Sequence, residues 1–124
     1  MSVGPILHLL PRAGWDAFLA SSEPAYTPAS LAAEGFVHCT SGDDVLLRVA
    51  NAFYRSEPGE MVALTVDPAL LTAEVRWEPP AHDDPLATER FPHVYGPLGR
   101  GAVVGVRRLE RDAAGAYTGF GTST

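Results

Sequence analysis

The sequence predicts one α+β domain with a mixed or mainly antiparallel sheet and two or three helices. Its 124 residues suffice for a single hydrophobic core but are too few for two stable domains. Hydrophobic residues make up 46% of the chain and charged residues 19%, which is the balance of a folded globular protein. Strand-like and helix-like segments do not alternate regularly, and this order favours α+β over a doubly wound parallel sheet.

The first expected element is a short strand. Residues 5–10 are apolar and too few for a surface helix, and Pro11 ends the run. Alternation along a strand divides its side chains between two faces. The two predicted faces are Ile6, His8 and Leu10 on one side and Leu7 and Leu9 on the other.

Three helical segments are expected next. Trp15, Phe18 and Leu19 have the spacing of one helical stripe, within about residues 14–21. A two-turn helix is expected between Thr27-Pro28 and Gly35, because these residue types begin and end helices. The longest helix is expected at about residues 43–56, capped by Ser41 or Gly42. Its apolar stripe consists of Val45, Leu46, Val49 and Phe53.

A second short strand is expected at residues 36–40, between the last two helices. Alternation places Val37 and Cys39 on one face. The other face carries Phe36, His38 and Thr40, so His38 and Cys39 point apart and do not form a thiol–base pair.

The second half of the chain predicts three or four more strands. Residues 61–66 are almost wholly apolar, which is typical of a central strand buried on both sides. Residues 74–78 alternate, with Val75 and Trp77 on the apolar face. Further strands are expected within 91–98 and at 101–109. The remaining segments are a loop at 79–90 and a flexible, glycine-rich tail at 112–124, leaving a core of about 5–111.

Composition excludes several classes of function. A net charge of −6 and a pI near 5.0 argue against partners that need a positive field, so we expect neither nucleic acid nor a membrane as partner. All nine basic residues are Arg, which excludes Schiff-base chemistry and a P-loop lysine. With one cysteine, no intrachain disulfide can form; with no signal-like or membrane-spanning run either, we expect a cytoplasmic protein.

Three histidines are the main candidates for chemistry. His8, His38 and His93 each lie in an apolar, strand-like segment, where one histidine alone is usually a hydrogen-bonded core residue. Three in so small a domain favour a pocket shared by at least two of them. The same three could hold zinc or iron, although their spacing lacks the close pairs that many metal sites show, and no metal is favoured.

Other residues could complete such a pocket. Glu78 ends an alternating strand, where it is either solvated or placed to stabilise positive charge in a substrate. Tyr95 lies two residues after His93, on the same face, and either packs in the core or stacks on a flat ligand. Thr40 and Ser41 either cap the next helix or hold a phosphate or a ribose hydroxyl.

Several motifs together resemble a known bacterial family, called domain of unknown function 952. The motifs are Ile6-Leu7-His8, Gly35-Phe36-Val37-His38-Cys39-Thr40 and Phe91-Pro92-His93-Val94-Tyr95-Gly96-Pro97-Leu98, with Trp15 and Glu78 between them. The similarity covers about residues 6–109. It implies the ADP-ribosyltransferase fold, a split α+β sheet that binds NAD in a cleft.

The resemblance also implies roles for single residues. His8 matches the first-strand residue that contacts the nicotinamide ribose, and His38 with Thr40 occupies the second strand, which flanks the nicotinamide. The late glutamate that orients the acceptor corresponds to Glu78, unless His93 replaces it. The expected catalytic residues are therefore His8, His38, Glu78 and His93, and the expected cofactor-binding residues are His8, Trp15, His38, Thr40 and Tyr95.

Three hypotheses about function follow. The first is an NAD-utilising enzyme, a transferase or NAD glycohydrolase, that acts on a small molecule or a protein. The second is a binding module that holds a nucleotide or another small ligand in the same cleft without catalysis. The third is a metal-dependent enzyme with the three histidines as ligands. The oligomeric state and a lid role for the 79–90 loop stay open.

Overall fold

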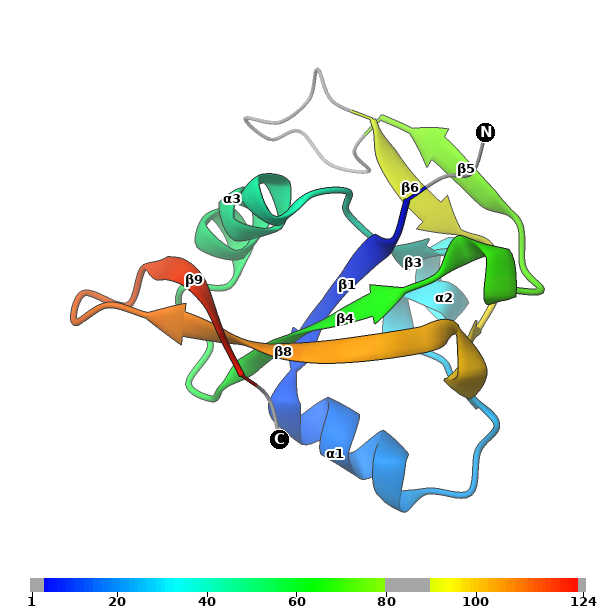
Figure 1. Cartoon of the computed structure of the whole chain (residues 1–124), viewed down its shortest axis with the longest axis horizontal. Helices are drawn as coiled ribbons and strands as arrows, with labels where there is room; N and C mark the ends of the chain where they lie inside the picture. Colours follow the sequence, from blue (N-terminus) through cyan, green and yellow to red (C-terminus); the bar gives the residue numbers. More distant parts are fainter. Residues whose placement is uncertain (1–3, 80–89, 123–124) are drawn as a thin grey trace.

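The computed structural model describes residues 4–79 and 90–122 and places its strands in one large and two small antiparallel sheets (Figure 1). The helices are α1 (Arg12–Ala20), α2 (Ala29–Glu34) and α3 (Asp43–Phe53), with 3-10 turns η1 (Pro68–Leu70) and η2 (Arg100–Ala102). The strands are β1 (Ile6–Pro11), β2 (Ala25–Tyr26), β3 (Val37–His38), β4 (Met61–Val66), β5 (Val75–Glu78), β6 (Phe91–Val94), β7 (Leu98–Gly99), β8 (Val103–Arg111) and β9 (Tyr117–Thr122).

The large sheet has the strand order β1-β4-β8-β9, and β4 is its most buried strand. Val62, Leu64 and Val66 of β4 face one hydrophobic cluster, which includes Trp15 and Phe18 of α1. The opposite face of β4 packs with α3, through Leu46 and Ala50. The prediction of a central strand buried on both sides is therefore confirmed, and α1 and α3 cover opposite faces of the sheet (Figure 1).

The sheet is split beside β1. A second sheet, β3-β6-β5, lies beside the large one, and the backbone bridge between the two sheets in the described chain pairs Leu7 of β1 with Thr40 after β3. Two backbone hydrogen bonds form this junction, Leu7 N–H to the Thr40 carbonyl at 2.8 Å and Thr40 N–H to the Leu7 carbonyl at 2.7 Å. All strand pairs among the described residues are antiparallel, which agrees with the predicted class.

The predicted faces of the first two strands are confirmed. Ile6 and Leu10 pack in the cluster of α1, whereas Leu7 packs in the cluster of α3. Val37 and Cys39 are core residues, and the His38 ring lies on the opposite face, against the rings of Phe36 and His93. Gly35 ends α2 in the left-handed conformation, with φ of 87°.

Several predictions were wrong in detail. The tail expected to fray forms the turn after Arg111 and then β9, which pairs with β8 and packs against α3. The helix expected at 14–21 begins at Arg12, because Pro11 is already its N-cap. The short β2–β7 pair was not predicted, since two-residue strands have no periodicity to detect. Of the loop predicted at 79–90, residues 80–89 lie outside the described residues.

Two apolar side chains are more exposed than the sequence suggested. Trp77, expected on the half-buried face of its strand, is 39% exposed, and Phe53 of the predicted α3 stripe is 47% exposed. No helix of the described chain is long and apolar enough to cross a membrane.

Candidate functional site

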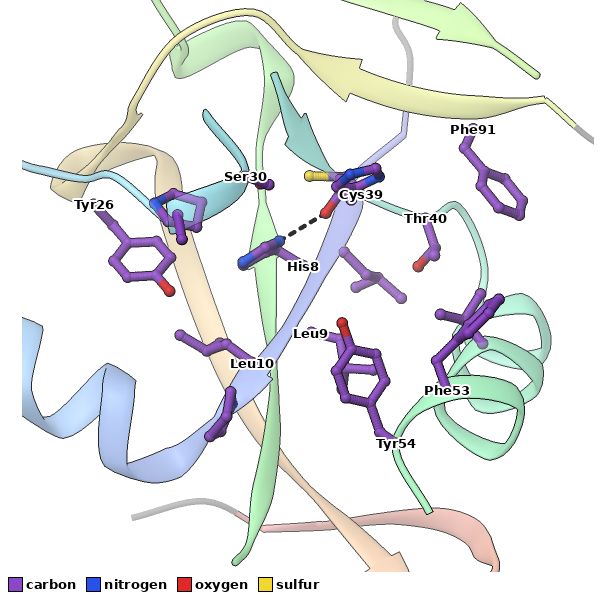
Figure 2. Close-up of a pocket in the computed structure, with 16 residues that line it drawn as sticks. His8, Leu9, Leu10, Tyr26, Ser30, Cys39, Thr40, Phe53, Tyr54 and Phe91 are labelled. Atoms are coloured by element: carbon purple, nitrogen blue, oxygen red, sulfur yellow. Dashed lines mark hydrogen bonds between the residues drawn. The ribbon is translucent and has the colours of Figure 1, made fainter. Parts of the chain in front are cut away.

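A cavity of about 510 Å³ lies where the sheet splits, between β1 and the segment that follows β3. Its lining includes residues of β1, of the β2–α2 segment, of the segment after β3, and of α3 with the residue that follows it (Figure 2). The residues that line it are Leu7, His8, Leu9, Leu10, Pro11, Tyr26, Pro28, Ala29, Ser30, His38, Cys39, Thr40, Val49, Phe53, Tyr54 and Phe91. Most of this surface is apolar or aromatic, with a few polar atoms set into it.

The peptide of Leu9 presents an unpaired strand edge to this cavity. In an antiparallel strand, the N–H and C=O of alternate residues point to the same edge. Leu7 uses both groups to bind Thr40, away from β4, so Leu9 also points its N–H and C=O away from β4. No described residue pairs with them, because β3 has diverged from β1 at this point. Within the described part of the chain, the Leu9 N–H and C=O are therefore left without a partner strand at the edge of β1 that borders the cavity.

His8 contributes a neutral imidazole with a defined tautomer. Its Nδ1 lies 2.7 Å from the backbone carbonyl oxygen of His38, which can only accept a hydrogen bond, so Nδ1 carries the proton. The side chain is 6% exposed, and burial lowers its pKa from 6.5 to about 4. At neutral pH its Nε2 is therefore an acceptor, and this edge of the ring faces away from His38, toward Tyr26 (Figure 2).

Thr40 places a hydroxyl in the same cavity. The side chain is only 5% exposed, and its Oγ1 has no hydrogen-bond partner among the described residues. A buried hydroxyl without a partner is costly in a folded protein, so the Thr40 hydroxyl is available to hydrogen-bond a molecule in the cavity. The neighbouring Cys39 is 2% exposed, and burial raises the pKa of its thiol, which fits the small core residue that was predicted.

Aromatic rings hold one wall of the cavity in place. Tyr26 lies with its ring centroid 5.8 Å from His8 and makes edge contacts with Trp15 and Phe18. Trp15 is stacked on Phe18 in the core, 6% exposed, and does not line the cavity. Trp15 thus supports Tyr26 from behind. Phe53, Tyr54 and Phe91 supply rings on the opposite side (Figure 2).

A second group of polar side chains lies on the outer face of the β3-β6-β5 sheet. Glu78 Oε1 accepts hydrogen bonds from His93 Nδ1 at 2.9 Å and from the Tyr95 hydroxyl at 2.6 Å. The Tyr95 hydrogen bond, followed by that of His93, lowers the pKa of Glu78, and the carboxylate in turn raises the pKa of Tyr95. His93 is 2% exposed and its Nε2 has no hydrogen-bond partner among the described residues.

Phe36 and His38 connect this group to the cavity. The Phe36 ring stacks on His93 at 4.2 Å and touches both His38 and Tyr95. His38 lies 5.5 Å from His93, ring to ring, and its Nε2 is 2.6 Å from a carboxylate oxygen of Glu34. Because His38 also lines the cavity, it is the link between the two groups.

The structure thus separates the predicted site residues into two neighbouring sets. His8, His38 and Thr40 line the cavity, whereas Glu78, His93 and Tyr95 form the hydrogen-bonded group beside it. Sequence reasoning did not identify Tyr26, Ser30 and Tyr54 as cavity residues, because they lie in short or irregular segments without a motif. It also missed Glu34, although its spacing of four residues from His38 is visible in the sequence.

The arrangement does not support the hypothesis of a three-histidine metal site. Among residues 4–79 and 90–122, no three His, Cys, Asp or Glu side chains converge in a way that could hold a metal ion. His8 uses one ring nitrogen on a backbone carbonyl, while His38 and His93 each bond a different glutamate.

Comparisons with known proteins agree with this geometry only at the level of family and fold. The crystal structure of protein CC0527 from Caulobacter crescentus shares 30% identity, with a TM-score of 0.72 over 92% of this chain and 93% of that chain. The crystal structure of a double mutant of CC0527 gives 29% identity and the same TM-score and coverage. No curated protein matches the sequence. The family described as "Protein of unknown function (DUF952)" matches residues 9–106, and the chain therefore belongs to that family.

Proposed function

We propose that the chain binds NAD in the cavity at the sheet split and acts on the bond between nicotinamide and ribose, as an ADP-ribosyltransferase-like enzyme. The acceptor would be a small molecule, a protein side chain or water. The observation that carries this proposal is the free peptide edge of Leu9, set between His8 and Thr40 in a cavity of about 510 Å³.

A carboxamide matches the free edge of Leu9. It has one N–H donor and one carbonyl acceptor on the same side, as a peptide does, so it can pair with Leu9 as a neighbouring strand would. Nicotinamide carries such a group on a flat ring. The rings of Tyr26, Phe53 and Tyr54 offer faces and edges against which that ring can pack.

The polar atoms nearby fit the sugar that follows. Ribose hydroxyls donate hydrogen bonds, and His8 Nε2 can accept one because its Nδ1 holds the proton. The hydroxyl of Thr40 can donate or accept, and it has no partner in the described protein. Both groups flank Leu9, so a ligand anchored at Leu9 by its amide has its next polar atoms close to them.

The proposed reaction needs stabilisation of positive charge more than a protein nucleophile. The carbon–nitrogen bond breaks with its electron pair leaving on nicotinamide, and an oxocarbenium-like ribose is attacked by the acceptor, which gives up a proton. The ionised Glu78 carboxylate and the Glu34 carboxylate are the anionic groups on the side of His38. Fixed groups of this kind stabilise a developing cation without reorganisation.

Calorimetric titration with NAD tests the proposal. The most informative variant is Thr40→Val, because it removes a hydroxyl that no described residue uses, so stability should be kept while NAD affinity falls by about tenfold. The matched control is Thr65→Val on β4, which does not line the cavity. His8→Ala should lower affinity further. No heat of binding at millimolar NAD would overturn the proposal.

An activity assay on the same proteins distinguishes an enzyme from a binding module. Glu78 Oε1 accepts hydrogen bonds from His93 and Tyr95, which lower the pKa of the carboxyl group and hold it in place, and the Glu78→Gln variant removes its charge. Nicotinamide release above the rate of the Glu78→Gln variant would identify an enzyme. Binding of NAD with no release would leave the non-catalytic module as the function.

A further inference from the structure

We propose that the cavity recognises its ligand as a nucleoside, through nicotinamide and ribose, and that residues 4–79 and 90–122 provide no clamp for the phosphates of NAD. This inference rests on the proposed function, because it concerns the same cavity. It comes from the charged groups around the cavity. A site that binds a dinucleotide by its pyrophosphate is expected to place cations against the phosphates, whereas this lining contains no Arg.

Apart from its two histidines, the described lining of the cavity has no side chain that is ionised at neutral pH. It contains no Arg, Asp or Glu, and its polar atoms come from hydroxyls, peptide groups and two imidazoles. His8 is held neutral by burial, with Nδ1 bound to a carbonyl. A phosphate drawn into this lining would lose its hydration without gaining a cation.

Seven of the nine arginines of the chain pair with other groups of the protein. All nine lie in the described residues, and none of them lines the cavity. Four face carboxylates and three donate to backbone carbonyls: Arg12, Arg76, Arg107 and Arg108 in the first group, and Arg55, Arg100 and Arg111 in the second. The other two, Arg48 and Arg90, are exposed.

The helix starts near the cavity do not replace a clamp. The first turn of α3 carries Asp43 and Asp44, which repel phosphate, and Asp43 already holds Arg107 through two hydrogen bonds of 3.0 and 2.7 Å. The starts of α1 and α2 are closer, since Pro11 and residues 28–30 line the cavity, but α2 has only six residues and carries no basic side chain. Arg12, the first residue of α1, forms ion pairs with Glu60 at 3.2 Å and with Asp16 at 3.6 Å.

The nicotinamide ring itself fits a cavity whose described lining contains no Arg, Asp or Glu. In oxidised NAD this ring is a cation, and a protonated His8 would repel it, whereas a neutral imidazole accepts a hydrogen bond and does not. The faces of Tyr26, Phe53 and Tyr54 attract a flat cation. The binding free energy is therefore concentrated in the nicotinamide riboside part of the ligand.

The test compares three ligands by calorimetry: nicotinamide riboside, nicotinamide mononucleotide and NAD. The riboside and the mononucleotide differ only by one phosphate, and we expect their dissociation constants to agree within about threefold, because no charge-assisted hydrogen bond is added. We also expect their affinities to change little with salt. Arg12→Ala, which removes the cation nearest to the α1 start, should leave the ratio of the two constants unchanged.

The possible results separate this inference from the proposed function. A mononucleotide that binds more than about tenfold more tightly than the riboside would show a phosphate clamp, at Arg12 if the gain is lost in Arg12→Ala and elsewhere if it is kept. Either result would overturn the inference while NAD binding stands. A strong salt dependence of the mononucleotide alone would do the same. If none of the three ligands binds at millimolar concentration, the proposed function fails and the inference fails with it.

Discussion

At the scale of single residues, His8 ties the stability of the fold to pH. Its pKa of about 4 in the folded protein is lower than the ordinary 6.5, so the unfolded chain binds a proton over this interval and the folded chain does not. The free energy of unfolding is therefore higher above pH 6.5 and falls as the pH drops toward 4. The protonation of His8 accounts for about 3 kcal/mol of this fall.

The variant His8→Asn should reduce that dependence. An asparagine amide can still donate to the His38 carbonyl but takes up no proton, so the loss of stability between pH 7 and pH 4 should be smaller than in the wild type. Urea unfolding at several pH values measures the difference. Equal pH dependence in the two proteins would show that His8 is not held neutral by the fold.

Glu78 is a second residue whose pKa links stability to pH, and hydrogen bonds rather than burial shift this pKa. Its pKa is lowered first by the Tyr95 hydroxyl and then by His93, so its contribution to stability is present above the ordinary carboxylate pKa and is lost as pH falls through the lower folded value. In Tyr95→Phe the pKa of Glu78 should rise toward its ordinary value. Carboxyl NMR titration measures it, with Tyr26→Phe as a control remote from Glu78. An unchanged midpoint in Tyr95→Phe would contradict the assigned cause.

At the scale of elements, α3 has two apolar residues with different roles. Leu46 is fully buried against the large sheet, whereas Phe53 is 47% exposed and lines the cavity. Leu46→Ala should cost about 3 kcal/mol of unfolding free energy because it leaves a hole in a packed core. Phe53→Ala should cost under about 1 kcal/mol, since little apolar area is uncovered, and should weaken ligand binding instead. Urea unfolding of both variants compares the costs, and similar values would contradict this division.

Helices and strands were predicted well from the sequence where the apolar periodicity is strong. They were predicted poorly where pairing with a distant strand determines whether the segment is ordered. The faces of the first two strands and both-sided burial at 61–66 follow from alternation and apolar runs, and they are confirmed. The expectation of a frayed tail from Asp112 was wrong because its glycines carry no pattern, while β8 supplies a partner for Tyr117–Thr122. Helical periodicity grouped Phe53 with Leu46 but cannot show where a core ends and a cavity begins.

At the scale of the whole molecule, the candidate site depends on a junction that local sequence does not encode. The histidine motifs indicated one shared pocket; His8 and His38 line the cavity, whereas His93 lies in the neighbouring group. The bridge between Leu7 and Thr40, however, joins segments far apart in the chain, and the free edge of Leu9 exists only because β3 diverges after that bridge. Residues such as Tyr26 and Ser30 enter the site through this packing, not through any motif.

The same junction predicts unequal stability in the two halves of the sheet. β4 has strand partners on both sides and is buried on both faces, so its amides should exchange with solvent only when the whole molecule unfolds. β5 is an edge strand of the small sheet, with Arg76 and Trp77 exposed. Among the described residues, one backbone bridge and the hydrogen bond from His8 to the His38 carbonyl join that sheet to the large one.

Native-state hydrogen exchange measured by NMR should therefore show the amides of β5 that pair with β6 exchanging through local opening, with smaller opening free energies than those of β4. A ligand that spans the split contacts both halves, so saturating NAD should raise the protection of the β3 and β6 amides more than that of the β8–β9 pair. Equal opening free energies in β4 and β5 without ligand would show that the two halves unfold as one unit. The Leu7–Thr40 bridge would then couple the sheets more tightly than its two hydrogen bonds suggest.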